Sequence, residues 1–229
     1  MKKSSYCLII YLLPFCCCDK DLPLKDEVEY NKSIPKSILK ASKQNKLSET
    51  IRFQDINFKN TLMEKGIDKN RDGEIQKGEV KYIKQLEISR KRISSLAEII
   101  YFNNLEILNC SNNKLEKLNL SKNLNLKSLG CKNNMLINLI ISNNSLLETL
   151  NCSNNKLVNL DLSNNTKIRG LLCSNNRLIN LNLSKNNNLE VLICENNALS
   201  CIKIPVNTKN KKRFWYKDDT AFYSTDCFD

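Results

Sequence analysis

The chain has 229 residues, 41% of them hydrophobic and 26% charged, and its formal net charge is +12. It contains no histidine, which excludes Ser-His-Asp and Cys-His catalysis by its own residues and removes the commonest neutral metal ligand. The basic residues are scattered along the chain, so we interpret them as solvated surface and predict no nucleic-acid partner.

The segment from Met1 to Cys18 predicts export. The positive start MKK precedes YCLIIYLLPF, an apolar run with the length of a signal-peptide core, too short to span a bilayer. CCC follows at once and matches a lipobox imperfectly, since Cys16 has Phe15 directly before it and Cys18 has Phe15 at the third position before it. We predict a signal peptide with lipidation at Cys18 or Cys16, and an ordinary cleaved signal is the alternative. The protein is then an outer-membrane or cell-surface lipoprotein, held to the membrane by its lipid alone, or a secreted protein.

Residues 19–50 are rich in Lys, Glu, Asp, Asn and Ser and contain few large apolar residues. Such a segment cannot bury much surface, which predicts a flexible tether. Residues 51–103 then predict a small helical N-terminal cap. Within it, Phe58, Leu62 and Met63 share one face of a short helix.

The segment DKNRDGEIQKGE, residues 68–79, matches the calcium loop of an EF-hand. Calcium prefers roughly six to eight oxygen ligands, which this loop supplies as side chains, one carbonyl and a water. We predict a structural calcium site formed by Asp68, Asn70, Asp72, Glu74, Gln76 and Glu79. Only one such loop is visible and cationic side chains surround it, so a turn stabilised by its own side chains is the alternative.

The segment LNCSNNKL at residues 108–115 recurs at residues 150–157, and related segments follow the same 21-residue period. Each 21-residue unit contains two copies of the pattern Leu-x-x-Leu-x-Leu/Cys-x-x-Asn. The pattern predicts a β-rich solenoid of about five leucine-rich units over residues 104–204, each with two short strands. Residues 205–229 then form an aromatic C-terminal cap.

These nested repeats resemble the 21-residue leucine-rich repeats of internalin-like and other secreted or surface bacterial proteins. The segment before the repeats and the tail CIKIPVNTKNKKRFWYKDDTAFYSTDCFD resemble the two caps of such proteins in Gram-negative bacteria. The resemblance implies protein recognition or adhesion at the cell surface, with no common enzymatic activity.

One cysteine recurs at the same position of each successive unit, which raises the question of a metal or redox role. In stacked units the thiols form one column with neighbours about 4.8 Å apart, and a straight column cannot surround zinc tetrahedrally. Cysteine also packs well as a small apolar side chain. We therefore predict five buried spacers, namely Cys110, Cys131, Cys152, Cys173 and Cys194.

Two further cysteines fall outside the column. Cys201 and Cys227 form a predicted disulfide that ties the tail to the last unit of an exported protein, and two free thiols are the alternative. Asparagines recur on the same period as the column, and we predict that their amides pair with backbone groups at the turns.

The outward side chains of the first strand in each unit become apolar towards the C-terminus. Leu172, Val191 and Ile193 are predicted to be neighbours there, and exposed apolar clusters often mark interfaces. We therefore predict a monomeric protein that binds a macromolecular partner at these residues. The alternatives are a binder of anionic surface glycan, which would use the Lys and Arg excess, and an effector enzyme, for which no catalytic segment is found.

Overall fold

The structure is a computed structural model that describes residues 49–206 and 214–227. The predicted signal peptide, with Cys16 and Cys18, lies outside the described residues, as does nearly all of the predicted tether. Within the described ranges, no helix has both the length and the apolar character that a membrane span requires.

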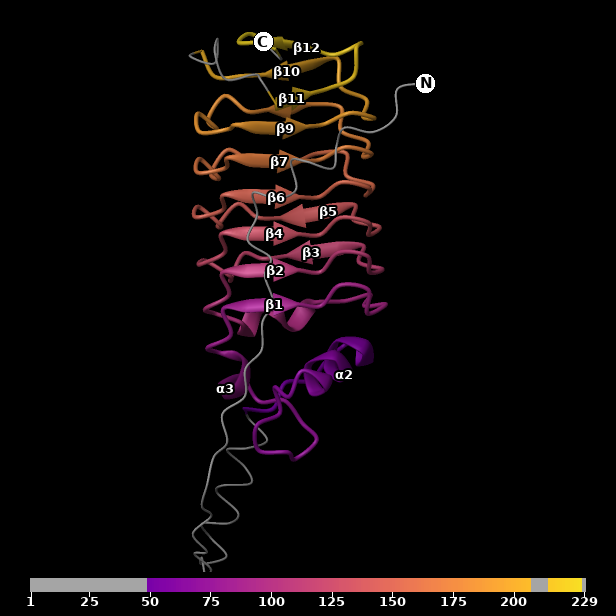
Figure 1. Cartoon of the computed structure of the whole chain (residues 1–229), viewed down its shortest axis with the longest axis vertical. Helices are drawn as coiled ribbons and strands as arrows, with labels where there is room; N and C mark the ends of the chain where they lie inside the picture. The colour runs from indigo at the N-terminus through magenta and orange to yellow at the C-terminus, as the bar shows by residue number, and fades with distance from the viewer. Residues whose placement is uncertain (1–48, 207–213, 228–229) are drawn as a thin grey trace, which may run out of the picture. The chain divides into compact units, whose positions relative to one another are not determined.

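The first stretch of every unit adds one strand to a seven-stranded parallel sheet (Figure 1). Strands of neighbouring units pair at equivalent positions of the repeat, so that Leu108 pairs with Leu129 and Leu129 with Leu150. The two caps supply the first and last strands. The strands are, in order across the sheet, β1 (Gln85–Glu87), β2 (Ile107–Asn109), β4 (Ser128–Gly130), β6 (Thr149–Asn151), β7 (Gly170–Leu172), β9 (Val191–Ile193) and β11 (Phe214–Tyr216).

The strands on the second stretches of the units form two smaller parallel sheets, and β3 and β5 run opposite to the strands of the larger sheet (Figure 1). One contains β3 (Lys117–Asn119) and β5 (Asn138–Ile140), and the other contains β12 (Phe222–Ser224), β10 (Cys201–Lys203) and β8 (Leu181–Asn182). Residues 159–161 lie between these two sheets and form no strand. The predicted leucine-rich solenoid is confirmed. The unit that contains residues 159–161 has one strand, β6, where we predicted two.

One continuous apolar cluster runs through the stacked coils, where a coil is one 21-residue turn of the solenoid. It extends from Ile51 in the N-terminal cap to Ala221 in the C-terminal cap. The strand side chains alternate between this core and solvent, as in Ile107–Asn109, where only Leu108 is buried. All five cysteines of the column are buried free thiols.

The N-terminal cap closes one end of the core with α2 (Ile56–Glu64), α3 (Lys77–Val80) and the 3-10 helix η2 (Ala97–Tyr101). Phe58 of α2 is fully buried, and its ring centroid lies 6.1 Å from that of Phe102. Asp55 caps α2 and also accepts hydrogen bonds from Ser94. Burial raises the pKa of Asp55, but hydrogen bonds from Ser94, Phe58 and Ser95 outweigh this and lower the pKa overall. The carboxylate thus joins the helix to the chain that enters the repeats.

Buried asparagines satisfy the turns of each coil. Asn155 donates to the carbonyls of Cys131 and Cys152, at 3.1 and 2.9 Å, and its Oδ1 accepts from Leu136 N at 2.9 Å. It therefore bonds to its own coil and to the preceding one. The side chains in this row are Asn113, Asn134, Asn155, Asn176 and Asn197.

A second row of asparagines is less completely paired. Asn165 donates to the carbonyls of Ile141 and Asn144, at 3.0 and 2.8 Å. Its Oδ1 is buried and accepts no hydrogen bond from the described part of the chain, and the same holds for its equivalents Asn123, Asn144 and Asn186. Since an unpaired buried acceptor costs free energy, this row stabilises each coil less than the first.

A third row of asparagines turns the chain after each cysteine. These residues have φ between 54° and 58°, in the left-handed region that asparagine tolerates better than other side chains with a Cβ. The row consists of Asn112, Asn133, Asn154, Asn175 and Asn196. The repeated asparagine pair therefore has two jobs, in which the first residue turns the backbone and the second bonds to it.

The environment of the cysteine column makes folding sensitive to alkaline pH. Burial raises the pKa of the Cys152 thiol from 9.0 to about 12. Between these two pH values the unfolded chain has lost a proton that the folded chain retains, so the free energy of unfolding falls as pH rises. Burial likewise raises the pKa of the other four thiols of the column.

We expect the destabilisation caused by Cys152→Ala to be about 1.4 kcal/mol smaller at pH 10 than at pH 8, because the variant removes one such thiol. The measurement is urea unfolding of parent and variant at both pH values. Leu162→Ala removes an inward side chain that does not titrate, so it should lower the free energy of unfolding by the same amount at both pH values. An equal cost of Cys152→Ala at the two pH values would contradict the buried, neutral thiol.

Candidate functional site

Two rows of solvent-facing side chains cross the seven-stranded sheet. Near β2 they are mostly polar, as at Asn109 and Ser128, and Gly130 leaves one position bare. Towards the other edge they become apolar. The first row is Ile107, Ser128, Thr149, Gly170, Val191 and Phe214. The second row, beside the first, is Asn109, Gly130, Asn151, Leu172, Ile193 and Tyr216.

The apolar ends of these rows form one surface, which we call the C-terminal apolar patch. It consists of Leu172, Val191, Ile193, Phe214 and Tyr216. The structure places Leu172 beside Ile193 and pairs Val191 with Gly170. These three predicted residues are half-buried, whereas Phe214 is 40% exposed.

The cap residues of the patch escaped the sequence analysis. Phe214 pairs with Val191, and Tyr216 with Ile193, because β11 extends the sheet beyond β9. The 21-residue period ends before this strand, so periodicity could not assign its register. The alternation in FWY, with Trp215 buried and its two neighbours facing outwards, was the available signal.

The C-terminal cap is fastened to the last coils in several ways. Trp215 is buried, its Nε1 donates to the Glu190 carbonyl at 3.2 Å, and its ring centroid lies 5.6 Å from that of Tyr223. Cys201 and Cys227 are joined by a disulfide, with their Cα atoms 5.9 Å apart. These contacts give the patch a fixed backbone, which a binding surface needs to limit the entropy lost on association.

A row of alternating charges borders the same sheet, one residue before each strand. Glu106 pairs with Lys84 at 3.1 Å and with Lys127 at 2.8 Å, and Arg169 pairs with Glu190 at 2.9 Å. Hydrogen bonds from Lys127 and Lys84 lower the pKa of Glu106. Exposed pairs of this kind add little stability, but insertion or loss of one whole coil would set like charges side by side.

The candidate calcium loop is held by hydrogen bonds from its own backbone. Asp68 accepts from Asp72 N and Gly73 N, at 3.2 and 3.0 Å, and Glu79 accepts from Lys69 N and Gln76 N, at 2.7 and 2.8 Å. Each carboxylate oxygen has a second lone pair that could bind a cation. Within the ranges that the structure describes, however, no three His, Cys, Asp or Glu side chains converge as a metal-binding group.

The loop pairs with a strand segment of its own cap. Ile51 N donates to the Ile75 carbonyl at 2.8 Å, and Thr50 and Gln76 form an antiparallel bridge. Ile75 itself is fully buried. EF-hand loops usually pair with a second loop. Here residues 50–51 take the place of that second loop.

Comparison with solved structures gives the same fold. The functional domain of InlJ from Listeria monocytogenes, described as including a cysteine ladder, is 26% identical with a TM-score of 0.57 over 66% of this chain. The ectodomain of the Arabidopsis thaliana receptor kinase GASSHO1/SCHENGEN3, solved with CASPARIAN STRIP INTEGRITY FACTOR 2, is 22% identical with a TM-score of 0.53 over 64%. Internalin C2 from Listeria monocytogenes is 19% identical with a TM-score of 0.50 over 75% of this chain and 94% of its own.

This chain spans only 38% of the InlJ structure and 19% of the plant ectodomain. No protein-family model and no curated protein matches the sequence. The structural neighbours therefore identify the architecture, and this chain has the leucine-rich-repeat solenoid fold of the internalin type.

Proposed function

We propose that this protein is a non-enzymatic binding module that works outside the cell and recognises another protein through its seven-stranded sheet. The observation that carries the proposal is the C-terminal apolar patch, where five apolar side chains meet on a rigid, capped edge. Burial of such a surface by a partner releases water from apolar atoms at little conformational cost. The resemblance of the repeats to those of secreted and surface bacterial proteins supports an extracellular role.

The patch offers the kind of centre that protein interfaces use. Phe214 and Tyr216 are aromatic, and aromatic residues are enriched in the residues that dominate binding energy. The polar rows near β2 and the alternating charges beside the sheet would form the rim. Leu172, Val191 and Ile193, the contact residues predicted from the sequence, lie between these two aromatic residues and the polar part of the sheet near β2.

The patch can be tested by making its centre polar without touching the core. We expect the double substitution Leu172→Asn and Ile193→Asn to abolish capture of the partner, because both side chains face outwards and asparagine already occupies this row in Asn109 and Asn151. The measurement is quantitative mass spectrometry of proteins captured by the immobilised full chain from extracts and culture fluid of neighbouring cells.

The matched control is Ile107→Thr, an outward apolar residue in the polar half of the sheet. It should capture the same proteins as the parent. Circular dichroism and thermal unfolding would establish that all three proteins fold. Undiminished capture by the folded double variant would exclude the patch as the binding surface.

We also propose that residues 68–79 bind one structural calcium ion. The ligands would be side-chain oxygens of Asp68, Asn70 and Asp72, the carbonyl of Glu74, a water held by Gln76 and both oxygens of Glu79. The pairing of Ile51 with Ile75 supports this interpretation, because it supplies the backbone partner that a lone loop lacks.

We expect calcium at ten times its Kd to stabilise the folded protein by about 1.4 kcal/mol, with a Kd on the order of 0.1–1 mM. Thermal unfolding with chelator and with millimolar calcium measures the shift. Glu79→Gln should abolish it, whereas Glu74→Gln should retain it, because Glu74 would bind through its backbone. Equal shifts in these two variants would exclude the proposed ligand set.

Export with a lipid anchor is the remaining part of the proposal, and it rests on the sequence from Met1 to Cys18. We expect the expressed full chain to partition into the detergent phase of a Triton X-114 separation, because a diacylated cysteine adds a large apolar surface. Substitution of Cys16, Cys17 and Cys18 by serine should move the protein to the aqueous phase. Identical partitioning of the two proteins would exclude the lipid anchor and favour secretion with an ordinary cleaved signal peptide.

A further inference from the structure

The second-strand side of the solenoid contains an interruption. In its two small sheets, Leu120 N donates to the Ile140 carbonyl at 3.0 Å and Leu183 N donates to the Lys203 carbonyl at 2.7 Å. Among the residues that the structure describes, the equivalent bonds from Ile141 and Leu162 do not form. Residues 159–161 therefore join neither neighbouring sheet, and no strand ladder engages their backbone groups.

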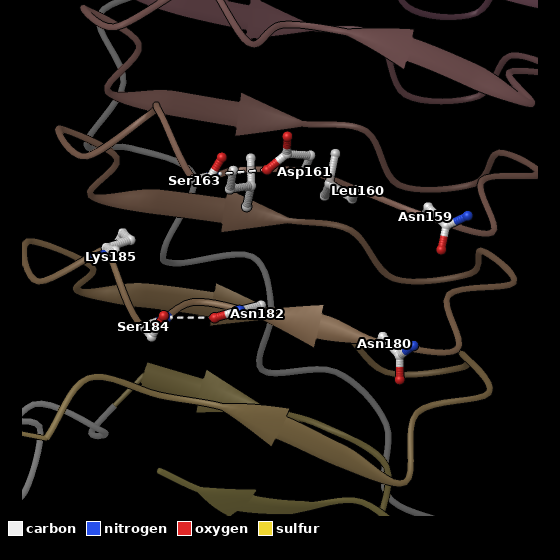
Figure 2. A pocket seen from close by; sticks show the side chains of 9 residues that line it. Asn159, Leu160, Asp161, Ser163, Asn180, Asn182, Ser184 and Lys185 are labelled. Atoms are coloured by element: carbon white, nitrogen blue, oxygen red, sulfur yellow. Dashed lines mark hydrogen bonds between the residues drawn. The ribbon is translucent and has the colours of Figure 1, made fainter. Parts of the chain in front are cut away.

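A groove of about 290 Å³ lies at this interruption, between two neighbouring coils (Figure 2). We call it the second-strand groove. Its apolar lining is Leu160 and Leu162, and its polar lining is Asn159, Asp161, Ser163, Asn180, Asn182, Ser184 and Lys185.

Some of the polar groups are fixed and others are free. Asp161 accepts from Ser163 N at 2.9 Å and Asn182 accepts from Ser184 N at 3.0 Å, which holds both side chains in place (Figure 2). Hydrogen bonds from Ser163 lower the pKa of Asp161, so its carboxylate stays ionised at neutral pH. The side chains of Asn159, Asn180 and Lys185 make no hydrogen bond or ion pair with the described part of the chain. Their amide and ammonium groups can therefore bond to a ligand.

Apolar side chains border the groove. Val158 and Ile179 directly precede Asn159 and Asn180, and they are 41% and 48% exposed. The groove and its border thus combine aliphatic surface with the free amide groups of Asn159 and Asn180 on two successive coils.

We propose that the second-strand groove binds an uncharged carbohydrate chain. Each sugar ring carries both C–H faces and hydroxyl groups, which match the exposed aliphatic side chains and the amide groups of the groove. The single anion Asp161 and the single cation Lys185 balance, so the groove has no net attraction for an anionic ligand. This site is distinct from the C-terminal apolar patch, which lies on the seven-stranded sheet.

The test is isothermal titration of the full chain with hexamers of β-1,4-linked glucose, β-1,4-linked N-acetylglucosamine and α-1,4-linked glucose. A galacturonate hexamer is the anionic arm. We expect saturable binding of at least one neutral hexamer, weakened about fivefold or more by Asn180→Ala, since one lost hydrogen bond costs about 1 kcal/mol. Asp161→Asn should weaken binding in the same sense while it preserves the turn with Ser163.

Asn138→Ala is the matched control, because Asn138 occupies the same row as Asn180 but lies in the intact sheet of β3 and β5. It should bind like the parent, as should the Leu172→Asn, Ile193→Asn double variant. No binding of any neutral hexamer, binding of the galacturonate hexamer alone, or an equal loss in Asn138→Ala would each overturn the proposal.

Discussion

The fold depends on pairing the backbone groups that every turn of the solenoid buries. Strand ladders satisfy the straight segments, but the turns have no ladder, and an unpaired buried carbonyl is costly. Asn155 and its equivalents meet this need by bonding to two successive coils at once. The 21-residue period that stacks the leucines therefore also places these amides within hydrogen-bonding distance of the carbonyls of two successive coils. A coil with a different length would lose its core contacts and its turn bonds together.

This dependence explains how far the sequence could predict the structure. The 21-residue period defines the rows of leucine, cysteine and asparagine, since each follows from the stacking of identical coils. It carries no information on β11, because Trp215 does not continue the repeat and is placed by its hydrogen bond to Glu190 and its packing against Tyr223. The aromatic half of the C-terminal apolar patch was accordingly missed.

The interruption at residues 159–161 was invisible for a different reason. Asp161 and Asn182 make the same local turn, yet on the second-strand side only the segment of Asn182 pairs with a neighbouring strand. The two segments, LVNLDLSNN and LINLNLSKN, are nearly alike, so residue preference does not distinguish the unpaired one from the paired one. The candidate calcium loop shows the opposite case, in which the ligands were evident in the sequence but their support by Ile51 was not.

The alternating charges beside the seven-stranded sheet restrict how the array can evolve. Glu106, Lys127, Glu148, Arg169 and Glu190 follow one another in successive coils. Duplication of one unit would set two like charges against each other, whereas duplication of two adjacent units would preserve the alternation. The pairing of the seven-stranded sheet is indifferent to this choice, because the first strand of every unit offers its neighbours the same bonds. Lengthening or shortening of the solenoid by gene rearrangement should therefore be tolerated best in pairs of units.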